Sequence, residues 1–100
     1  MVKHVVMWRL KERALGNDKA FNARLVKEKL EGLAGRIPGL LAIEVGFDFS
    51  LTPASYDLVL YSEFTDRKAL DGYQRHPEHE AVQDFISAVR MERAVVDYDC

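Results

Sequence analysis

The chain has 100 residues, of which 48% are hydrophobic and 30% are charged. This length and composition are typical of one small globular domain, so we expect a single domain over residues 1–100. The formal net charge is −2 and the basic residues do not cluster, which argues against a nucleic-acid-binding surface. No apolar run is long enough to cross a membrane, and no signal peptide is expected. Cys100 is the only cysteine, which excludes an internal disulfide and a thiolate zinc site and predicts a cytoplasmic location.

The first half of the chain predicts a strand, a helix and a second strand. Residues 2–10 are rich in valine and predict a strand. The side chains on one face of this strand are Val2, His4, Val6, Trp8 and Leu10. Residues 17–37 carry apolar side chains at spacings of three and four, which predicts a helix capped by Asn17 or Asp18. Residues 40–49 alternate and predict a strand. Its apolar face consists of Leu41, Ile43, Val45 and Phe47.

The second half predicts a strand, two helices and a last strand. Residues 56–64 form the third predicted strand. One face of this strand consists of Tyr56, Leu58, Leu60 and Phe64. Residues 65–73 predict a short helix, and residues 77–90 predict a longer one with His76 as its N-cap. Residues 92–99 predict the closing strand.

The resulting order, β-α-β-β-α-β, predicts an α+β domain of the ferredoxin-like type. Such a domain has a four-stranded antiparallel sheet with its helices on one face. The opposite face of the sheet would then be apolar and open to water. Its side chains are Val5, Met7, Val59, Tyr61 and Val96. Because exposed apolar faces of this kind mark interaction surfaces, we expect a homodimer in which two sheets pack face to face.

Five segments of the chain, in this order, resemble the stress-responsive A/B barrel (Dabb) family of dimeric α/β-barrel proteins. The segments are residues 2–12, 37–50, 56–64, 73–86 and 95–99. The resemblance covers essentially the whole chain and implies a ferredoxin-like subunit in a dimer closed by back-to-back sheets. The family it implies is functionally mixed, with stress-induced plant proteins and plant polyketide cyclases. The related dimeric α/β barrels include small-molecule monooxygenases and haem-degrading enzymes.

Three polar residues are expected to converge between the helices and the sheet. His79 shares a helical face with apolar residues that must look toward the sheet, so we expect it to be partly buried. His4 lies on the strand face directed at the same space, and Tyr73 ends the preceding short helix. A neutral imidazole can accept a proton near pH 7, and a tyrosine hydroxyl can donate to a developing oxyanion.

The resemblance assigns roles to these residues. In the family's polyketide cyclases, a histidine and a tyrosine of this segment carry the acid/base chemistry, and His79 and Tyr73 stand at those positions. They are the candidate catalytic residues. The candidate substrate-binding residues are His4, Trp8, Leu30 and Leu58. Leu30 and Leu58 stand where the cyclases carry polar groups, which weakens the transfer of cyclase activity and favours an apolar or aromatic ligand.

Other interpretations are open from sequence. One is a non-catalytic stress-response protein that acts through its dimer or a higher assembly, with His79 and Tyr73 in structural roles. Another is a monooxygenase that uses Trp8 and a histidine. No metal centre or cofactor is expected, because Gln83 replaces the second histidine of an H-E-x-x-H motif and no phosphate-binding glycine loop is present. Weak Mg²⁺ binding by loop carbonyls leaves no signature in a sequence.

Overall fold

The computed structural model describes residues 1–100 and is built around one four-stranded sheet. The strands are β1 (Val2–Leu10), β4 (Leu40–Phe47), β5 (Leu58–Phe64) and β6 (Arg90–Asp99). They lie in the order β4-β5-β1-β6, and every neighbouring pair is antiparallel. This is the ferredoxin-like α+β fold that the sequence predicts.

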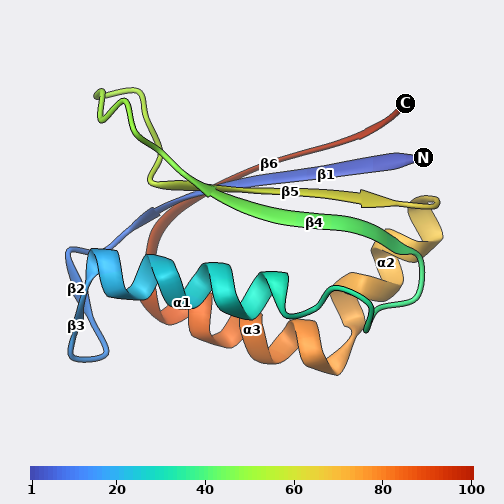
Figure 1. Ribbon diagram of the computed structural model, residues 1–100, viewed down its shortest axis with the longest axis horizontal. Coiled ribbons are helices and arrows are strands. Elements are labelled where there is room, and N and C mark those ends of the chain that lie inside the picture. The colour runs from blue at the N-terminus through green and yellow to red at the C-terminus, as the bar shows by residue number, and fades with distance from the viewer.

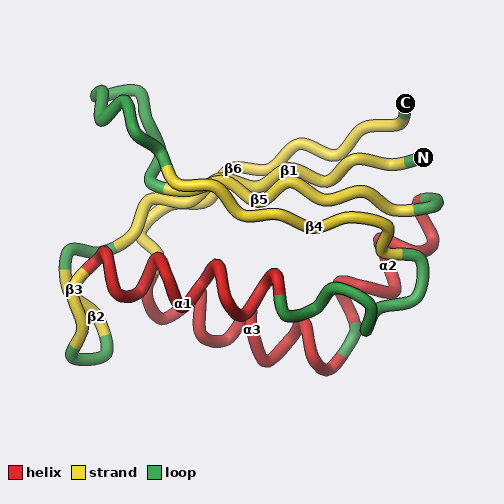
Figure 2. Tube along the Cα trace, viewed as in Figure 1, coloured by secondary structure: helices red, strands yellow, loops and turns green.

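All the helices lie on one side of the sheet (Figure 1). They are α1 (Lys19–Glu31), α2 (Arg67–Arg75) and α3 (Pro77–Val89). Helices α1 and α3 run side by side beneath the sheet, and α2 lies at the end near both termini (Figures 1 and 2). A small hairpin of β2 (Arg13–Ala14) and β3 (Asn17–Asp18), which the sequence analysis did not predict, precedes α1. No helix is long and apolar enough to cross a membrane.

Helix α1 is shorter than predicted. Asp18 caps its start as expected, with Oδ1 accepting a backbone N–H at 2.8 Å. The helix ends at Glu31, because the following residues form turns in which Gly35 has a positive φ of 76°. Leu33 and Ile37 still reach the core from these turns. Their burial explains why an apolar spacing of three and four continued beyond the helix.

The face assignment of β1 is confirmed. Its even-numbered residues are buried against the helices. On β5, the side chains of Leu58, Leu60, Ser62 and Phe64 lie on the same face, in register with Trp8, Val6, His4 and Val2. Because β1 is the inner strand between β5 and β6, residues on its helix side are covered from both flanks. Any polar side chain on this face is therefore held inside the domain.

Two smaller predictions on strand faces are wrong. Leu41 is 54% exposed and does not share the face of Ile43, because a β-bulge between Leu40 and Ala42 breaks the alternation. Tyr56 was placed on the helix side, but β5 begins only at Leu58. The Tyr56 ring instead lies against the Arg9 guanidinium, 4.3 Å from ring centre to Cζ.

The opposite face of the sheet, which we call the outer face, is covered by no helix (Figure 1). Its apolar side chains pair across strands as predicted, with Val5 opposite both Tyr61 and Val96, and Met7 opposite Val59. Within the single chain these residues are only half-buried or exposed. The outer face is thus an apolar surface that the chain itself leaves in contact with water.

Candidate functional site

His4 lies in the middle of the helix side of the sheet and is only 3% exposed. Its Nδ1 is hydrogen-bonded to Oδ1 of Asp97, the residue directly opposite on β6. Since the carboxylate accepts, the proton sits on Nδ1, and Nε2 is left as an acceptor. The His4 carbonyl also accepts a hydrogen bond from Ser62 Oγ at 2.8 Å. Position, orientation and tautomer of this imidazole are therefore set by the sheet.

Tyr73 and His79 meet above this histidine. Their ring centroids are 4.0 Å apart with an interplanar angle of 34°, which is a tilted stack. The Tyr73 ring also lies edge-on to His4, at a centroid distance of 6.0 Å. Tyr73 is fully buried and His79 is 6% exposed. The three residues predicted to converge do lie together, and we call them the His-Tyr cluster.

A single corner of the chain brings Tyr73 and His79 into contact. His76 ends α2 and also caps α3, with extended backbone angles of φ −67° and ψ 133°. Its Nδ1 accepts the N–H of Glu78 at 3.2 Å, and Pro77 takes the first helical position. Because the residue before a proline avoids helical angles, the chain must turn at this point. The last turn of one helix is thereby placed against the first turn of the next.

Three buried polar atoms, two of them at this corner and one on β1, have no hydrogen-bond partner within the protein. They are Tyr73 Oη, His79 Nδ1 and Trp8 Nε1. A buried polar group without a partner costs roughly 1–3 kcal/mol, and such groups are rare in folded proteins. The unused capacity of Tyr73 and His79 lies at adjacent rings. No hydrogen bond within the protein engages either of these two atoms, although neither residue lines any of the four main surface hollows.

Burial sets the protonation of both residues. It lowers the pKa of His79 to about 4; a hydrogen bond with the backbone of Gln74 opposes the shift, and the electrostatic influence of His4, and then of Arg93, adds to it. Burial likewise raises the pKa of Tyr73 above its ordinary value. Near pH 7 the cluster therefore presents a neutral imidazole next to a protonated phenol. This combination offers one acceptor and one donor without net charge.

Two residues of β6 that the sequence analysis did not single out border the cluster. Asp97 holds His4, and Arg93 lies close enough to lower the pKa of both Tyr73 and His79. In register, Arg93 is opposite Trp8 and Asp97 is opposite His4. Alternation along residues 92–99 would have grouped these two charged residues on one face. Only the pairing of β6 with β1 shows that this face looks toward the histidines.

A surface hollow of about 350 Å³ lies beside Asp97 on β6, and none of the three cluster residues is part of its lining. It is lined by Val2, Arg67, Leu70, Asp97, Tyr98 and Asp99. Asp97 is shared, because one side of it lines the hollow and its Oδ1 bonds to His4. Arg67 Nε donates to Asp99 Oδ2 at 3.1 Å across the same surface. Asp97 is therefore the one residue that connects the lining of this hollow to the cluster.

The remaining predicted ligand contacts lie in the packed core. Trp8, Leu30 and Leu58 are each no more than 2% exposed and belong to the main hydrophobic cluster. None of the four main hollows brings one of them together with a residue of the His-Tyr cluster. Their role in binding stays a prediction. No group of three or more His, Cys, Asp or Glu side chains is placed to hold a metal ion.

Comparison with known proteins decides the family. The model of the stress responsive A/B barrel domain, Dabb, matches residues 2–100. The chain belongs to the Dabb family. It is similar to a dimeric protein of unknown function with a ferredoxin-like fold from Bacteroides fragilis, at 32% identity and a TM-score of 0.85. That match covers 99% of this chain and 95% of the other.

Two further matches are a relative in sequence and a protein of similar structure. An uncharacterized protein of Streptomyces coelicolor is 32% identical over 81 residues, which is 81% of each chain. A putative antibiotic biosynthesis monooxygenase from Nitrosomonas europaea has a TM-score of 0.77 at 19% identity, covering 100% of this chain and 98% of that one. The second likeness shows a shared fold alone. The family thus establishes the architecture of this Dabb protein and leaves its ligand to be argued from the site.

Proposed function

We propose that this Dabb protein is a homodimer that binds a small, largely apolar or aromatic molecule at the His-Tyr cluster and carries out cofactor-free acid/base chemistry on it. One observation supports this most strongly. Tyr73 Oη and His79 Nδ1 are buried, belong to rings 4.0 Å apart, and have no hydrogen-bond partner in the protein. A carbonyl-bearing molecule offers the acceptor that the phenol lacks and an acidic C–H that the imidazole can deprotonate.

The proposed step is proton abstraction next to a carbonyl. The C–H bond α to the carbonyl breaks and its electron pair forms the C=C bond of the enolate, while the C=O π pair moves onto the oxygen and the proton goes to His79 Nδ1. Tyr73 Oη donates a hydrogen bond to the developing enolate oxygen. A pKa of about 4 makes His79 a weak base in the free protein. In the proposed step, the negative charge of the forming enolate stabilises the imidazolium and so favours proton transfer to His79. His4, held by Asp97, orients the substrate through its free Nε2.

The surroundings support a ligand with an apolar body. The cluster is flanked by the buried rings and side chains of the core, including Phe64, whose centroid is 5.0 Å from that of Tyr73. We propose that Trp8, Leu30 and Leu58 contact the apolar part after local rearrangement of the core. We propose that the ligand enters at the hollow beside Asp97. Asp97 is exposed there and is hydrogen-bonded to His4 of the cluster.

The homodimer rests on two independent supports. The Bacteroides fragilis protein, which is 32% identical over nearly the whole chain, is described as dimeric. The outer face of this Dabb protein is also apolar and uncovered. We propose that the two sheets meet through the outer face, with Val5, Met7, Val59 and Tyr61 at the contact. Lys3 and Glu63 lie at one end of this face and Arg9 and Glu92 at the other, so the apolar residues form its central part.

The direct test is hydrogen–deuterium exchange at the α-carbon of aryl methyl ketones and polyketide-like aromatic ketones, followed by NMR. Wild-type protein should accelerate the exchange of at least one such compound. His79→Gln should reduce the acceleration by about 10²-fold or more, while Tyr73→Phe should weaken it with a smaller effect on binding. The matched control is His76→Asn, three residues away, which keeps an N-cap side chain. Equal rates for His79→Gln and wild type would contradict the proposed chemistry.

A monooxygenase is the second candidate. Trp8 Nε1 is a buried donor without a partner, and the fold resembles that of the Nitrosomonas europaea protein. Oxygen uptake with electron-rich phenols would favour this function, and Trp8→Phe should then abolish it. The non-catalytic alternative, a stress-response protein acting through its assembly, is supported by the close packing of Trp8, Leu30 and Leu58. That alternative predicts no binding and no exchange with any compound of the series.

A further inference from the structure

The loop between β4 and β5, residues 48–57, stands out from the rest of the surface, and we call it the arm. It rises from the sheet on the side opposite the helices (Figures 1 and 2). Its Phe49 and Leu51 are 91% and 83% exposed, more than any other large apolar side chain of the molecule. Apolar groups held this far into water stabilise nothing within their own chain.

The arm also borders the largest of the four main hollows. This hollow has a volume of about 400 Å³ and is lined mainly by apolar residues. Met7 and Val59 of the outer face contribute to its lining, and Phe49, Ala54 and Tyr56 contribute from the arm. The hollow therefore continues the apolar surface of the sheet up along the arm. Arm and outer face form one concave apolar surface rather than two separate patches.

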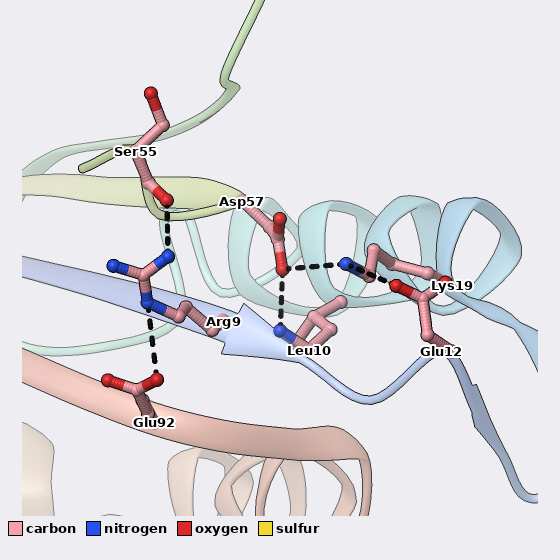
Figure 3. A network of polar contacts seen from close by, with 7 residues as sticks. All are labelled: Arg9, Leu10, Glu12, Lys19, Ser55, Asp57 and Glu92. Carbon is pink, nitrogen blue, oxygen red and sulfur yellow. Dashed lines mark hydrogen bonds and ion pairs between the residues drawn. The ribbon is translucent and has the colours of Figure 1, made fainter. Parts of the chain in front are cut away.

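The base of the arm is firmly anchored to the end of β1 (Figure 3). Arg9 donates to the carbonyl of Ser55 at 2.7 Å and pairs with Glu92 at 3.3 Å. Asp57 Oδ2 accepts the N–H of Leu10 at 2.7 Å and pairs with Lys19 at 3.4 Å. The N–H of Asp48, where β4 leads into the arm, also donates to the carbonyl of Asp57 at 3.0 Å, so both ends of the arm are held before any partner arrives. A preorganised contact loses less entropy on binding than a free loop.

The tip of the arm is held by its own short hydrogen bonds. Asp48 Oδ2 accepts the N–H of Leu51 at 2.8 Å, and the hydroxyls of Thr52 and Ser55 lie 2.8 Å apart. Leu51 has a positive φ of 54°, a conformation that leucine rarely adopts. Leu15, on the β2–β3 hairpin, has the same φ and is 62% exposed. The β2–β3 hairpin lies on the helix side of the sheet, away from the outer face (Figure 1), so Leu15 provides a matched control.

We propose that the arm is an inter-subunit clasp that seats Phe49 and Leu51 on a second copy of this chain. This inference rests on the proposed sheet-to-sheet homodimer, because that dimer puts the partner on the side toward which the arm rises. The continuity of the hollow with Met7 and Val59 links the arm to the same contact. In a two-fold dimer the arm of each subunit contacts the other subunit, so Phe49 and Leu51 form two equivalent contacts.

The test compares dimer dissociation constants from sedimentation equilibrium. The double variant Phe49→Ser/Leu51→Asn should raise the dissociation constant at least about tenfold, since clasp residues are lost at two symmetric sites. Asparagine tolerates a positive φ, so the backbone of the arm is retained. Leu15→Asn should stay within about twofold of wild type. A double variant that dimerises as tightly as wild type would overturn the clasp.

A fluorescent probe keeps the two proposals distinguishable. Trp8 is buried within the subunit, so its emission should not change when the dimer dissociates. The tryptophan of a Phe49→Trp protein should be covered in the dimer, and its emission should shift toward that of a water-exposed indole on dilution. Water-exposed emission that is unchanged in the dimer would overturn the clasp and leave the sheet contact intact. A wild-type protein that is monomeric at every concentration would instead overturn the homodimer, and the clasp with it.

Discussion

The two faces of β1 differ in their exposure to water: the helix side is buried and the outer face is partly exposed. On the helix side, Val6 and Trp8 are at most 2% exposed, and the space is filled by the chain's own helices together with His4, Tyr73 and His79. On the outer face, Met7 is 37% exposed and no element of the chain covers it. The helix side buries two polar atoms, Tyr73 Oη and His79 Nδ1, that have no hydrogen-bond partner in the protein. The outer face leaves apolar side chains in contact with water. We interpret the unpartnered polar atoms as part of a ligand site and the exposed apolar side chains as a dimer contact.

The largest expected effect tests the outer face. Val59→Asp should dissociate or unfold the dimer, at a cost of about 3–5 kcal/mol, because it buries an unpaired charge between two sheets. Light scattering after size-exclusion chromatography would measure the change. Val95→Asp is the control, since Val95 is exposed on the helix side of β6 and should leave the dimer intact. An unchanged dimer in Val59→Asp would mean that the outer face is not the contact.

The next effect tests the helix side through pH. Burial lowers the pKa of His79 from 6.5 to about 4, so the unfolded chain binds more protons between these values. Stability should therefore be fully present above pH 6.5 and fall as the pH decreases through 6.5 to 4, by about 3 kcal/mol in total. Urea denaturation at a series of pH values would measure this. His79→Gln should flatten the dependence, whereas His76→Asn should preserve it.

Tyr73→Phe sharpens the contrast between a site residue and a core residue. The substitution keeps the ring stacked on His79 and removes only an unpartnered buried hydroxyl. We expect the free energy of unfolding to stay the same or rise by about 1 kcal/mol, while ligand binding or exchange activity falls. Thermal denaturation with and without ligand would compare the two effects. A clear loss of stability would indicate that the hydroxyl serves the fold.

The smallest effect concerns the charge beside the cluster. Arg93 lowers the pKa of both His79 and Tyr73. Arg93→Gln should shift the pKa of His79 upward, as observed by NMR titration of its imidazole protons, with little change in stability because Arg93 is exposed. Arg24→Gln, on α1, is a control that should leave this titration unchanged. If the pKa of His79 does not rise in Arg93→Gln, the Arg93 guanidinium does not act on the His-Tyr cluster.

The sequence by itself determined the order of the main elements, the faces of β1 and the convergence of His4, Tyr73 and His79. The order and the faces follow from local rules, since strand alternation and helical spacing depend only on neighbouring residues, whereas the expected convergence also needs the ferredoxin-like arrangement of the elements. The same rules misjudged Leu41 and Tyr56, and they extended α1 to residue 37. A bulge, a late strand start and a buried turn are consequences of packing, which spacing alone does not show.

The tertiary structure alone decided which groups meet across the sheet. The bond from His4 to Asp97 and the influence of Arg93 depend on the register of β6 against β1, which joins residues far apart in the chain. The same holds for the lack of partners at Tyr73 Oη and His79 Nδ1, because hydrogen bonding is a property of the whole surrounding volume. Residue types could nominate the site, and only the packed structure reveals its unused hydrogen-bonding capacity.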